Sequence, residues 1–269
     1  MRIVDNIAAL RVHTSLTRTN RSIEQSTLRL SSGYRINSAG DDPAGFAISL
    51  QLRNQIRSMN MADRNTLDGS SLLETADAAL QDLQDMIHRI RELAVQVSND
   101  TYNDWDRENT QREVYQLLTE ITDLTTKVEF NNIRLLNGET QNLRIQVGGR
   151  QHMSIAINIP SFTAEALGLA DLSVETWAGA QEAIELADAA IAEVSARRAN
   201  IGAFINRFEY TSSSLRSAVE ATTRSLSRVQ DTDMAYEMMQ LSINNILSQA
   251  GMAIMAQVNA RPQQILQLI

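Results

Sequence analysis

The sequence predicts a mainly α-helical protein, with an elongated, coiled-coil-like helical rod, a small β-hairpin, and a terminal two-helix coiled coil formed by the N- and C-termini. Three observations predict this fold class. Only 4% of the 269 residues are aromatic, with 11 glycines and 3 prolines, a composition typical of long helices and not of many-stranded β-proteins. No proline interrupts residues 44–159. Finally, four segments repeat apolar residues every seven positions, which predicts helices that pack at the shallow coiled-coil angle.

The middle of the chain is expected to form a rod domain over residues 44–229, with helices over about 44–98, 104–128 and 178–229. In the first of these helices the steps between apolar residues alternate between three and four without a fault. At about 1.5 Å per residue, the first and last rod helices reach roughly 80 Å, but the middle one only about 38 Å. A further element is therefore needed to cover the remaining apolar stripe.

A β-hairpin is predicted over about 141–160. Apolar and polar residues alternate on both sides of Gly148-Gly149, and Pro160 ends the pattern. Two strands of this length would cover part of the stripe that the short helix leaves. Residues 161–177 are interpreted as a short connector to the last rod helix.

The two ends, residues 1–32 and 230–269, are predicted to form the terminal coiled-coil domain. The C-terminal segment is apolar on nearly every face, and such a helix must be covered on several sides. One N-terminal helix cannot supply that cover, so it must come from other chains. The predicted self-assembly residues are the apolar positions of both ends: Ile3, Ile7, Leu10, Leu16, Ile23, Leu30, Leu247, Ala250, Ile254, Val258, Ile265 and Leu266.

A stretch rich in Ser, Gly, Asn and Asp, LRLSSGYRINSAGDDPAG (28–45), separates the N-terminal helix from the rod. Gly33 suits the left-handed position that ends a helix, and Asp42-Pro43 is typical of a helix start. A phosphate-binding loop is excluded because there is no Gly-Lys-Ser/Thr and no preceding strand. Residues 33–43 are therefore predicted to be a structured connector, with a generic linker as the alternative. Its key residues are Gly33, Tyr34, Asn37, Asp41, Asp42 and Pro43.

Charge and residue usage exclude several function classes. The net charge is −8 without a Lys/Arg cluster, which argues against nucleic acid as a partner. The absence of cysteine excludes disulfides, thiolate zinc sites and cysteine nucleophiles. His13, His88 and His152 lie in three different segments, so no metal site is expected. Asp41-Asp42 is interpreted as helix caps instead of catalytic carboxylates.

No catalytic chemistry is predicted. There is no G-x-S-x-G motif with a partner histidine, and we expect no enzyme activity and no cofactor. No apolar run near the N-terminus is longer than residues 7–10, so a cleaved secretory signal is not expected. Residues 238–260 carry no charge, but eight amide or hydroxyl side chains there would be costly in lipid. We therefore expect no membrane insertion.

Several stretches resemble bacterial flagellin, the subunit of the flagellar filament. LRLSSGYRINSAGDDPAG resembles its N-terminal signature, although Tyr34 and Pro43 stand where leucine and alanine are usual, and Val258 stands where alanine is usual. Only about 17 residues separate the hairpin from the last rod helix, so the chain resembles a minimal flagellin without outer variable domains. The other similar stretches are QLRNQIRSMNMADRNTLDGSSLLETADAAL (51–80), IRELAVQ (90–96), FNNIRLLNG (130–138) and NILSQAGMAIMAQVNARPQQILQLI (245–269).

The resemblance implies a structural subunit that polymerises into the flagellar filament for swimming motility. It further implies an unfolded passage through the flagellar type III export system and an extracellular location. The implied partners are other copies of the chain in a helical homopolymer, an export chaperone on the C-terminal segment, and the filament cap and hook–filament junction proteins. Within the family the terminal helices line a central channel, and the rod domain packs around them.

The resemblance also singles out a surface on two rod helices. Arg89, Leu93 and Gln96 lie at steps of four and three, so they share one face of a helix, and Glu113 on the next helix is expected nearby. The residues alone indicate only a solvated face. By resemblance, these four positions match a patch that a vertebrate Toll-like receptor recognises in some flagellins and that is buried between subunits in the filament.

Two other interpretations remain open. A hook–filament junction protein shares the plan of the termini but should not elongate by itself. A non-polymerising helical adaptor bundle would give a discrete oligomer with protease-resistant ends. Growth of filaments from purified subunits discriminates among the three.

Overall fold

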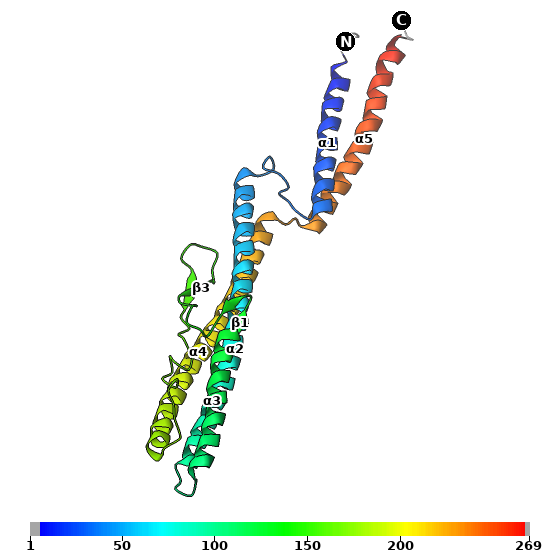
Figure 1. The fold of residues 1–269 in the computed structure, drawn as a ribbon. Coiled ribbons are helices and arrows are strands. Elements are labelled where there is room, and N and C mark those ends of the chain that lie inside the picture. Colours follow the sequence, from blue (N-terminus) through cyan, green and yellow to red (C-terminus); the bar gives the residue numbers. More distant parts are fainter. Residues whose placement is uncertain (1–5, 267–269) are drawn as a thin grey trace. The chain divides into compact units, whose positions relative to one another are not determined.

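The computed structural model describes residues 6–266, of which the last six are described by their backbone alone. This part of the chain is mainly α-helical, with five helices and two small antiparallel sheets (Figure 1). The predicted fold class is confirmed. In chain order the elements are α1 (Ile7–Ser32), α2 (Pro43–Val97), α3 (Asp104–Lys127), β1 (Glu129–Phe130), β2 (Ile133–Arg134), β3 (Leu143–Gln146), β4 (Ser154–Ile157), α4 (Trp177–Gln230) and α5 (Met234–Leu266).

The chain divides into two compact units. The first contains residues 1–56 and 220–269, and the second contains residues 57–219. The long helices α2 and α4 contribute residues to both. Across residues 6–266, no helix combines the length and the apolar character needed to cross a membrane.

The second unit is held by one continuous apolar core. The stripe with alternating steps of three and four is the α2 side of this core, because all its members are buried. Burial of large apolar side chains stabilises by roughly 1.5–3 kcal/mol each, which makes this stripe the main reason that α2 packs where it does. The buried members are Leu73, Ala76, Leu80, Leu83, Ile87, Ile90, Ala94 and Val97.

Three ion pairs set the antiparallel register of α2 and α4. Their α2 members lie two heptads apart, so they occupy the same position in the repeat. Exposed pairs of this kind contribute at most about 1 kcal/mol each, so their role is to fix register and not to supply the bulk of the stability. The pairs are Asp63 with Arg216 (3.2 Å), Asp77 with Arg198 (2.9 Å), and Arg91 with Asp188 (2.6 Å).

The expected β-hairpin is formed by β3 and β4. Leu143 pairs with Ile157 and Ile145 with Ile155, and the two isoleucines of β4 are buried while their neighbours are exposed. The alternation seen in the sequence therefore places one face of the hairpin on the core.

A second, shorter hairpin was not predicted. Strands β1 and β2 are only two residues long, and Asn131 and Asn132 connect them with φ angles of 49° and 64°. Asparagine tolerates this left-handed backbone better than most residues, and two such residues form the tight turn of a hairpin. Strands this short contain no detectable periodicity, so the Asn-Asn pair was the one available signal.

Residues 161–176 are irregular in backbone but belong to the core. Phe162 and Val174 are 1% and 0% exposed. The side chain of Gln111 on α3 holds the segment, because its Oε1 accepts from the Val174 amide at 2.6 Å and its Nε2 donates to the Leu172 carbonyl at 3.2 Å. A segment interpreted as a connector thus also covers the helices.

Gly69 is expected to be intolerant of a side chain. A Cβ atom there would lie 3.2 Å from both Ile145 Cγ2 and Phe208 Cε2, so Gly69→Val should lower the free energy of unfolding by about 1–3 kcal/mol through overpacking. Gly202, also helical, has nothing within 4 Å of such an atom. Gly202→Ala should therefore stabilise by about 0.5–1 kcal/mol. Urea unfolding followed by circular dichroism measures both, and equal effects of the two substitutions would contradict this packing.

Candidate functional site

The first unit brings together the two ends of the chain. Helices α1 and α5 lie side by side (Figure 1). Asn6 caps α1, because its Oδ1 accepts from the Ala9 amide at 3.1 Å, and its Nδ2 donates to the Val258 carbonyl at 3.3 Å. The terminal two-helix pair that the sequence predicts is thus present, and one side chain both starts α1 and contacts α5.

The seam between α1 and α5 contains both apolar and polar or small residues. On α1, Leu16, Ile23 and Leu30 are half-buried, as expected from their seven-residue spacing. On α5, the residues that meet α1 include Glu237 and Ser248. The seven-residue spacing does not indicate these polar contacts, because it is a pattern of apolar residues.

Three contacts align the two helices. Arg29 Nη1 lies 3.7 Å from Glu237 Oε2, and the Glu237 side chain is only 7% exposed. Ser248 Oγ donates to Asn20 Oδ1 at 3.3 Å. Gly251 sits so close to α1 that a Cβ atom would lie 2.9 Å from Leu16 Cδ1. Contacts of three different chemistries along the pair specify one register.

Another side of α5, about 100° around the helix from the seam, carries a second apolar row, which we call the outer stripe: Met239, Ile243, Leu247, Ala250 and Ile254. All five are exposed. At about 100° per residue they fall within roughly 80° of the helix circumference, away from the seam positions. One row of α5 is therefore used within the chain, and another is left uncovered.

The predicted self-assembly residues divide between these two surfaces. Leu16, Ile23, Leu30 and Val258 are half-buried, whereas the others for which exposure is described face solvent: Ile7, Leu10, Leu247, Ala250 and Ile254. Ile3 lies outside the described residues. Ile265 and Leu266 belong to the last turn of α5, beyond the side chains that the structure describes.

The connector is tied to the segment between α4 and α5. Gly33, with φ 74°, ends α1, and Tyr34 forms an antiparallel bridge with Asp231. The Arg35 amide donates to the Gln230 carbonyl at 2.7 Å, and the Thr232 amide donates to the Gly33 carbonyl at 3.0 Å. These bonds join two chain segments that are almost 200 residues apart in sequence.

Two acidic residues shape the far end of the connector. Asp41 Oδ2 accepts from the amides of Asn37 and Ser38 at 3.1 and 2.9 Å. These hydrogen bonds, first that from Ser38, lower the pKa of Asp41 below its usual 3.8. Asp42 caps α2 by accepting from the Gly45 amide at 3.0 Å, and Pro43 is the first helical residue. Both carboxylates therefore accept hydrogen bonds from backbone amides, but only Asp42 is a helix cap; for Asp41 that interpretation is wrong, because its hydrogen bonds lie within the connector.

Of the predicted patch of Arg89, Leu93, Gln96 and Glu113, only three residues are exposed. Arg89 Nε and Nη2 donate to Glu113 Oε1 at 3.0 and 2.7 Å, so the structure brings these two exposed residues together across α2 and α3. Gln96 is exposed and donates to Tyr102 Oη at 3.0 Å. Leu93, however, is 2% exposed and belongs to the core.

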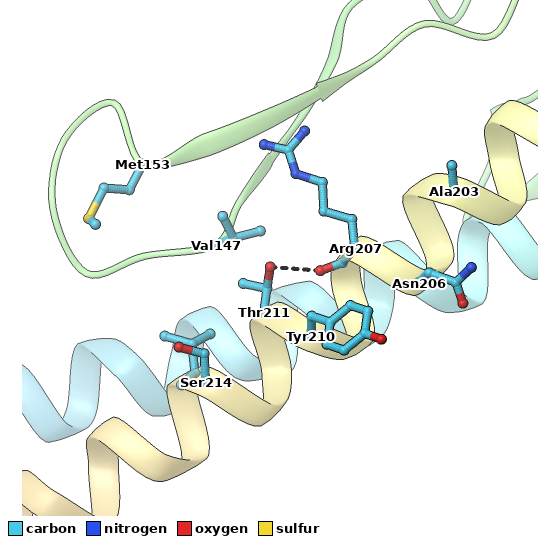
Figure 2. A pocket seen from close by; sticks show the side chains of 9 residues that line it. Val147, Met153, Ala203, Asn206, Arg207, Tyr210, Thr211 and Ser214 are labelled. Carbon is cyan, nitrogen blue, oxygen red and sulfur yellow. Dashed lines mark hydrogen bonds between the residues drawn. The ribbon is translucent and has the colours of Figure 1, made fainter.

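A groove of about 750 Å³ lies between the β3–β4 hairpin and α4 (Figure 2). Arg207 is its only charged residue, and Thr211 donates to the Arg207 carbonyl at 2.8 Å. Because no carboxylate, histidine or lysine lines it, the groove has no acid–base pair of the usual kind. Its lining consists of Val147, Met153, Ala203, Asn206, Arg207, Tyr210, Thr211, Ser214 and Leu215. Within residues 6–266, no three His, Cys, Asp or Glu side chains are grouped so that they could hold a metal ion.

A chain that has a terminal helix pair with an uncovered apolar row, and also a helical unit with a small hairpin, has features expected of a helical filament subunit. Residues 3–141 match the bacterial flagellin N-terminal helical region, and residues 184–269 match the C-terminal helical region. The chain belongs to the bacterial flagellin family. It is a minimal member and a structural subunit of the flagellar filament.

Individual relatives agree with this assignment. The chain is 39% identical to the flagellin of Bacillus subtilis (strain 168) over 303 residues, and 38% identical to the flagellar filament core protein flaB2 of Brachyspira hyodysenteriae over 284 residues. Both alignments cover all of this chain and all of the relative. The crystal structure of Bacillus cereus flagellin is similar over 56% of this chain and 88% of that chain, with a TM-score of 0.51 and 29% identity.

Gln230 provides the test of the connector. It is 3% exposed, its Oε1 accepts from Arg53 Nη2 at 2.9 Å, and its Nε2 donates to the Ile36 carbonyl at 3.4 Å. Gln230→Ala removes both bonds and leaves a buried carbonyl unsatisfied, at about 1–3 kcal/mol. Hydrogen exchange of the Arg35 and Thr232 amides should accelerate about tenfold or more.

The matched control is Gln51→Ala, which changes an exposed glutamine in the same unit and should leave both amides unchanged. If Gln230→Ala also leaves their exchange unchanged, the connector is not held by this residue.

Proposed function

We propose that the terminal domain, residues 1–32 and 230–269, is the element that assembles the filament, and that a second copy of this chain covers the outer stripe of α5. The observation that carries the proposal is the exposure of that stripe. Ile243, Leu247 and Ile254 are 43%, 53% and 48% exposed in the single chain. A heptad-like row of this kind is favoured to pack against another helix.

The composition of α1 supports coupling between folding and assembly. Five of its hydroxyl side chains donate back to the carbonyl four residues earlier: Thr14, Thr17, Thr19, Ser22 and Thr27. Such bonds compete with the helical ladder, so these residues favour a helix interior weakly. Helix α1 therefore depends on cover by neighbours for its stability, and the free ends of a subunit order when neighbours supply it.

The geometry of the contact favours an open polymer. The outer stripe and the α1–α5 seam are different surfaces of α5, and the stripe is not already satisfied within the chain. A contact between unlike surfaces of successive copies does not end at a two-fold dimer, and it generates a helical filament where the rotation between copies does not close a ring. The rod domain, residues 44–229, brings a core that is complete within one chain. We therefore assign stability to the rod and assembly to the ends.

Membership in the flagellin family implies the remaining partners. We infer that the chain leaves the cell unfolded through the flagellar type III system and functions outside it. An export chaperone would shield the apolar C-terminal segment beforehand, and the cap and hook–filament junction proteins would contact the two ends of the polymer. We further infer that the chain is not an enzyme, which its membership in a structural family supports.

The exposed Arg89–Glu113 pair and Gln96 are proposed as a contact for a vertebrate Toll-like receptor and for a neighbouring subunit. Leu93 would support this surface from within the core instead of touching the partner. Binding of the purified chain to the receptor ectodomain, measured by surface plasmon resonance, tests the proposal.

The central test replaces apolar side chains of the outer stripe. The double variant Ile243→Asn, Ile254→Asn should not elongate seeds of sheared filament, because the new amides would be buried without partners at about 1–3 kcal/mol each. Since both side chains are already exposed, unfolding of the rod domain should be unchanged. Light scattering and electron microscopy measure elongation.

The matched control is Asn245→Ala, Gln249→Ala, which alters two exposed polar residues of the same helix and should elongate normally. Elongation of the Ile243→Asn, Ile254→Asn variant at the unaltered rate would refute the proposal. A small closed oligomer formed by the unaltered chain despite seeds would instead favour the junction or adaptor interpretations.

A further inference from the structure

Methionine is concentrated on the helix that carries the outer stripe. Five of the ten methionines of the chain lie in α5, and four of these are about half exposed: Met234 (48%), Met238 (52%), Met239 (52%) and Met252 (53%). By contrast, Met59 on α2 is 7% exposed. The thioethers of α5 are therefore open to small reagents in the free subunit.

Two different outward faces of α5 carry these four residues. Met239 belongs to the outer stripe, where exposed aliphatic side chains such as Ile243 offer no hydrogen-bond donors. Met234, Met238 and Met252 fall within about 40° of one another on a second outward face, roughly 140–180° around the helix from the centre of the outer stripe at about 100° per residue. Asn245 and Gln249 also lie on this second face.

We propose that Met234, Met238, Met239 and Met252 form an oxidation site that decides whether a free subunit can enter a filament. The inference rests on the proposed function, in which the outer stripe of α5 becomes buried on assembly. It adds that neighbours also cover the second outward face, because a helix that is apolar on nearly every face must be covered on several sides. The reagent is a two-electron peroxide oxidant such as hydrogen peroxide. The site is open before assembly and closed after it.

The chemistry is the conversion of a thioether to a sulfoxide. A sulfur lone pair attacks one oxygen of H2O2, the S–O bond forms, and the O–O bond breaks. The departing hydroxide takes the remaining proton and leaves as water. Sulfur loses two electrons and the peroxide gains them. Methionine sulfoxide reductases reverse the change, so the modification is not terminal.

Oxidation should oppose assembly for a physical reason. A sulfoxide is polar and accepts strong hydrogen bonds, whereas a thioether is apolar and adapts to irregular packing. Burying the new oxygen against aliphatic side chains leaves it without a donor, and such burial is unfavourable. In an assembled subunit the same packing excludes the oxidant. Methionine oxidation should therefore be slower in the filament than in the free subunit.

The chain has internal controls. Met61 on α2 and Met153 in the hairpin loop are 52% and 50% exposed, as open as the four methionines of α5, but they belong to the second unit. Their oxidation should proceed equally fast without affecting elongation.

The experiment uses the full chain, partly oxidised with hydrogen peroxide, quenched with catalase, and then offered to sheared filament seeds. Pelleted polymer and supernatant are digested, and the sulfoxide at each methionine is quantified by mass spectrometry. Sulfoxides at the four α5 positions should be enriched at least tenfold in the supernatant, whereas those at Met61 and Met153 should be shared equally. An even distribution at all six positions would overturn the proposal.

Variants supply an independent readout. The unoxidised quadruple variant M234L/M238L/M239L/M252L should elongate and continue to elongate after peroxide, whereas M61L/M153L should lose at least tenfold in rate after peroxide, like the unaltered chain. Equal peroxide sensitivity of both variants would contradict the proposal. If the unoxidised quadruple variant does not elongate, the distribution of sulfoxides between polymer and supernatant, measured on the unaltered chain, tests the proposal instead.

Failure of this inference is distinguishable from failure of the proposed function. If the unoxidised chain elongates and the Ile243→Asn, Ile254→Asn variant does not, the assembly surface stands. Unimpaired elongation of the oxidised chain would then reject the oxidation site alone.

Discussion

Helix α5 has more apolar surface than its own chain can cover, and the organisation of the first unit depends on this constraint. Within the described residues, helix α1 packs on a single face of α5. That face combines polar and small residues, where Glu237 pairs with Arg29 and Gly251 lies close to Leu16, with the half-buried Leu241, Met255 and Val258. The polar and small residues fix how the two ends meet, and we propose that the exposed apolar residues of the outer stripe pack against other copies.

The second unit differs from the first, because its own elements bury its apolar residues. The apolar row of α2 is buried by α3, α4, the hairpin and the irregular segment around Phe162. Ion pairs such as Asp77 with Arg198 add register at the edge of this core. We propose that one chain therefore combines a unit whose core is complete within the chain with a unit that assembly completes.

Much of this could be predicted from the sequence, because heptads report directly on buried helix faces. The rod helices begin and end within one residue of the predicted positions, and Gly33 and Asp42-Pro43 mark the connector correctly as helix end and helix start. The spacing of apolar residues does not predict features that lack such a repeat. It missed the Asn131-Asn132 turn, the burial of residues around Phe162, and the polar side of the seam at Glu237 and Ser248. Burial of Leu93 also shows that residues spaced on one face need not share its exposure.

We propose that the terminal helices gain their stability from neighbouring subunits. Hydrogen exchange, measured residue by residue in the free subunit and in the filament, is the most direct test. We expect α1 and α5 to exchange rapidly in the free subunit and to become strongly protected in the filament. Buried α2 residues such as Leu83 and Ile87 should be protected in both. Equal and strong protection of α1 and α5 in the free subunit would contradict the claim, because the ends would then be stable without neighbours.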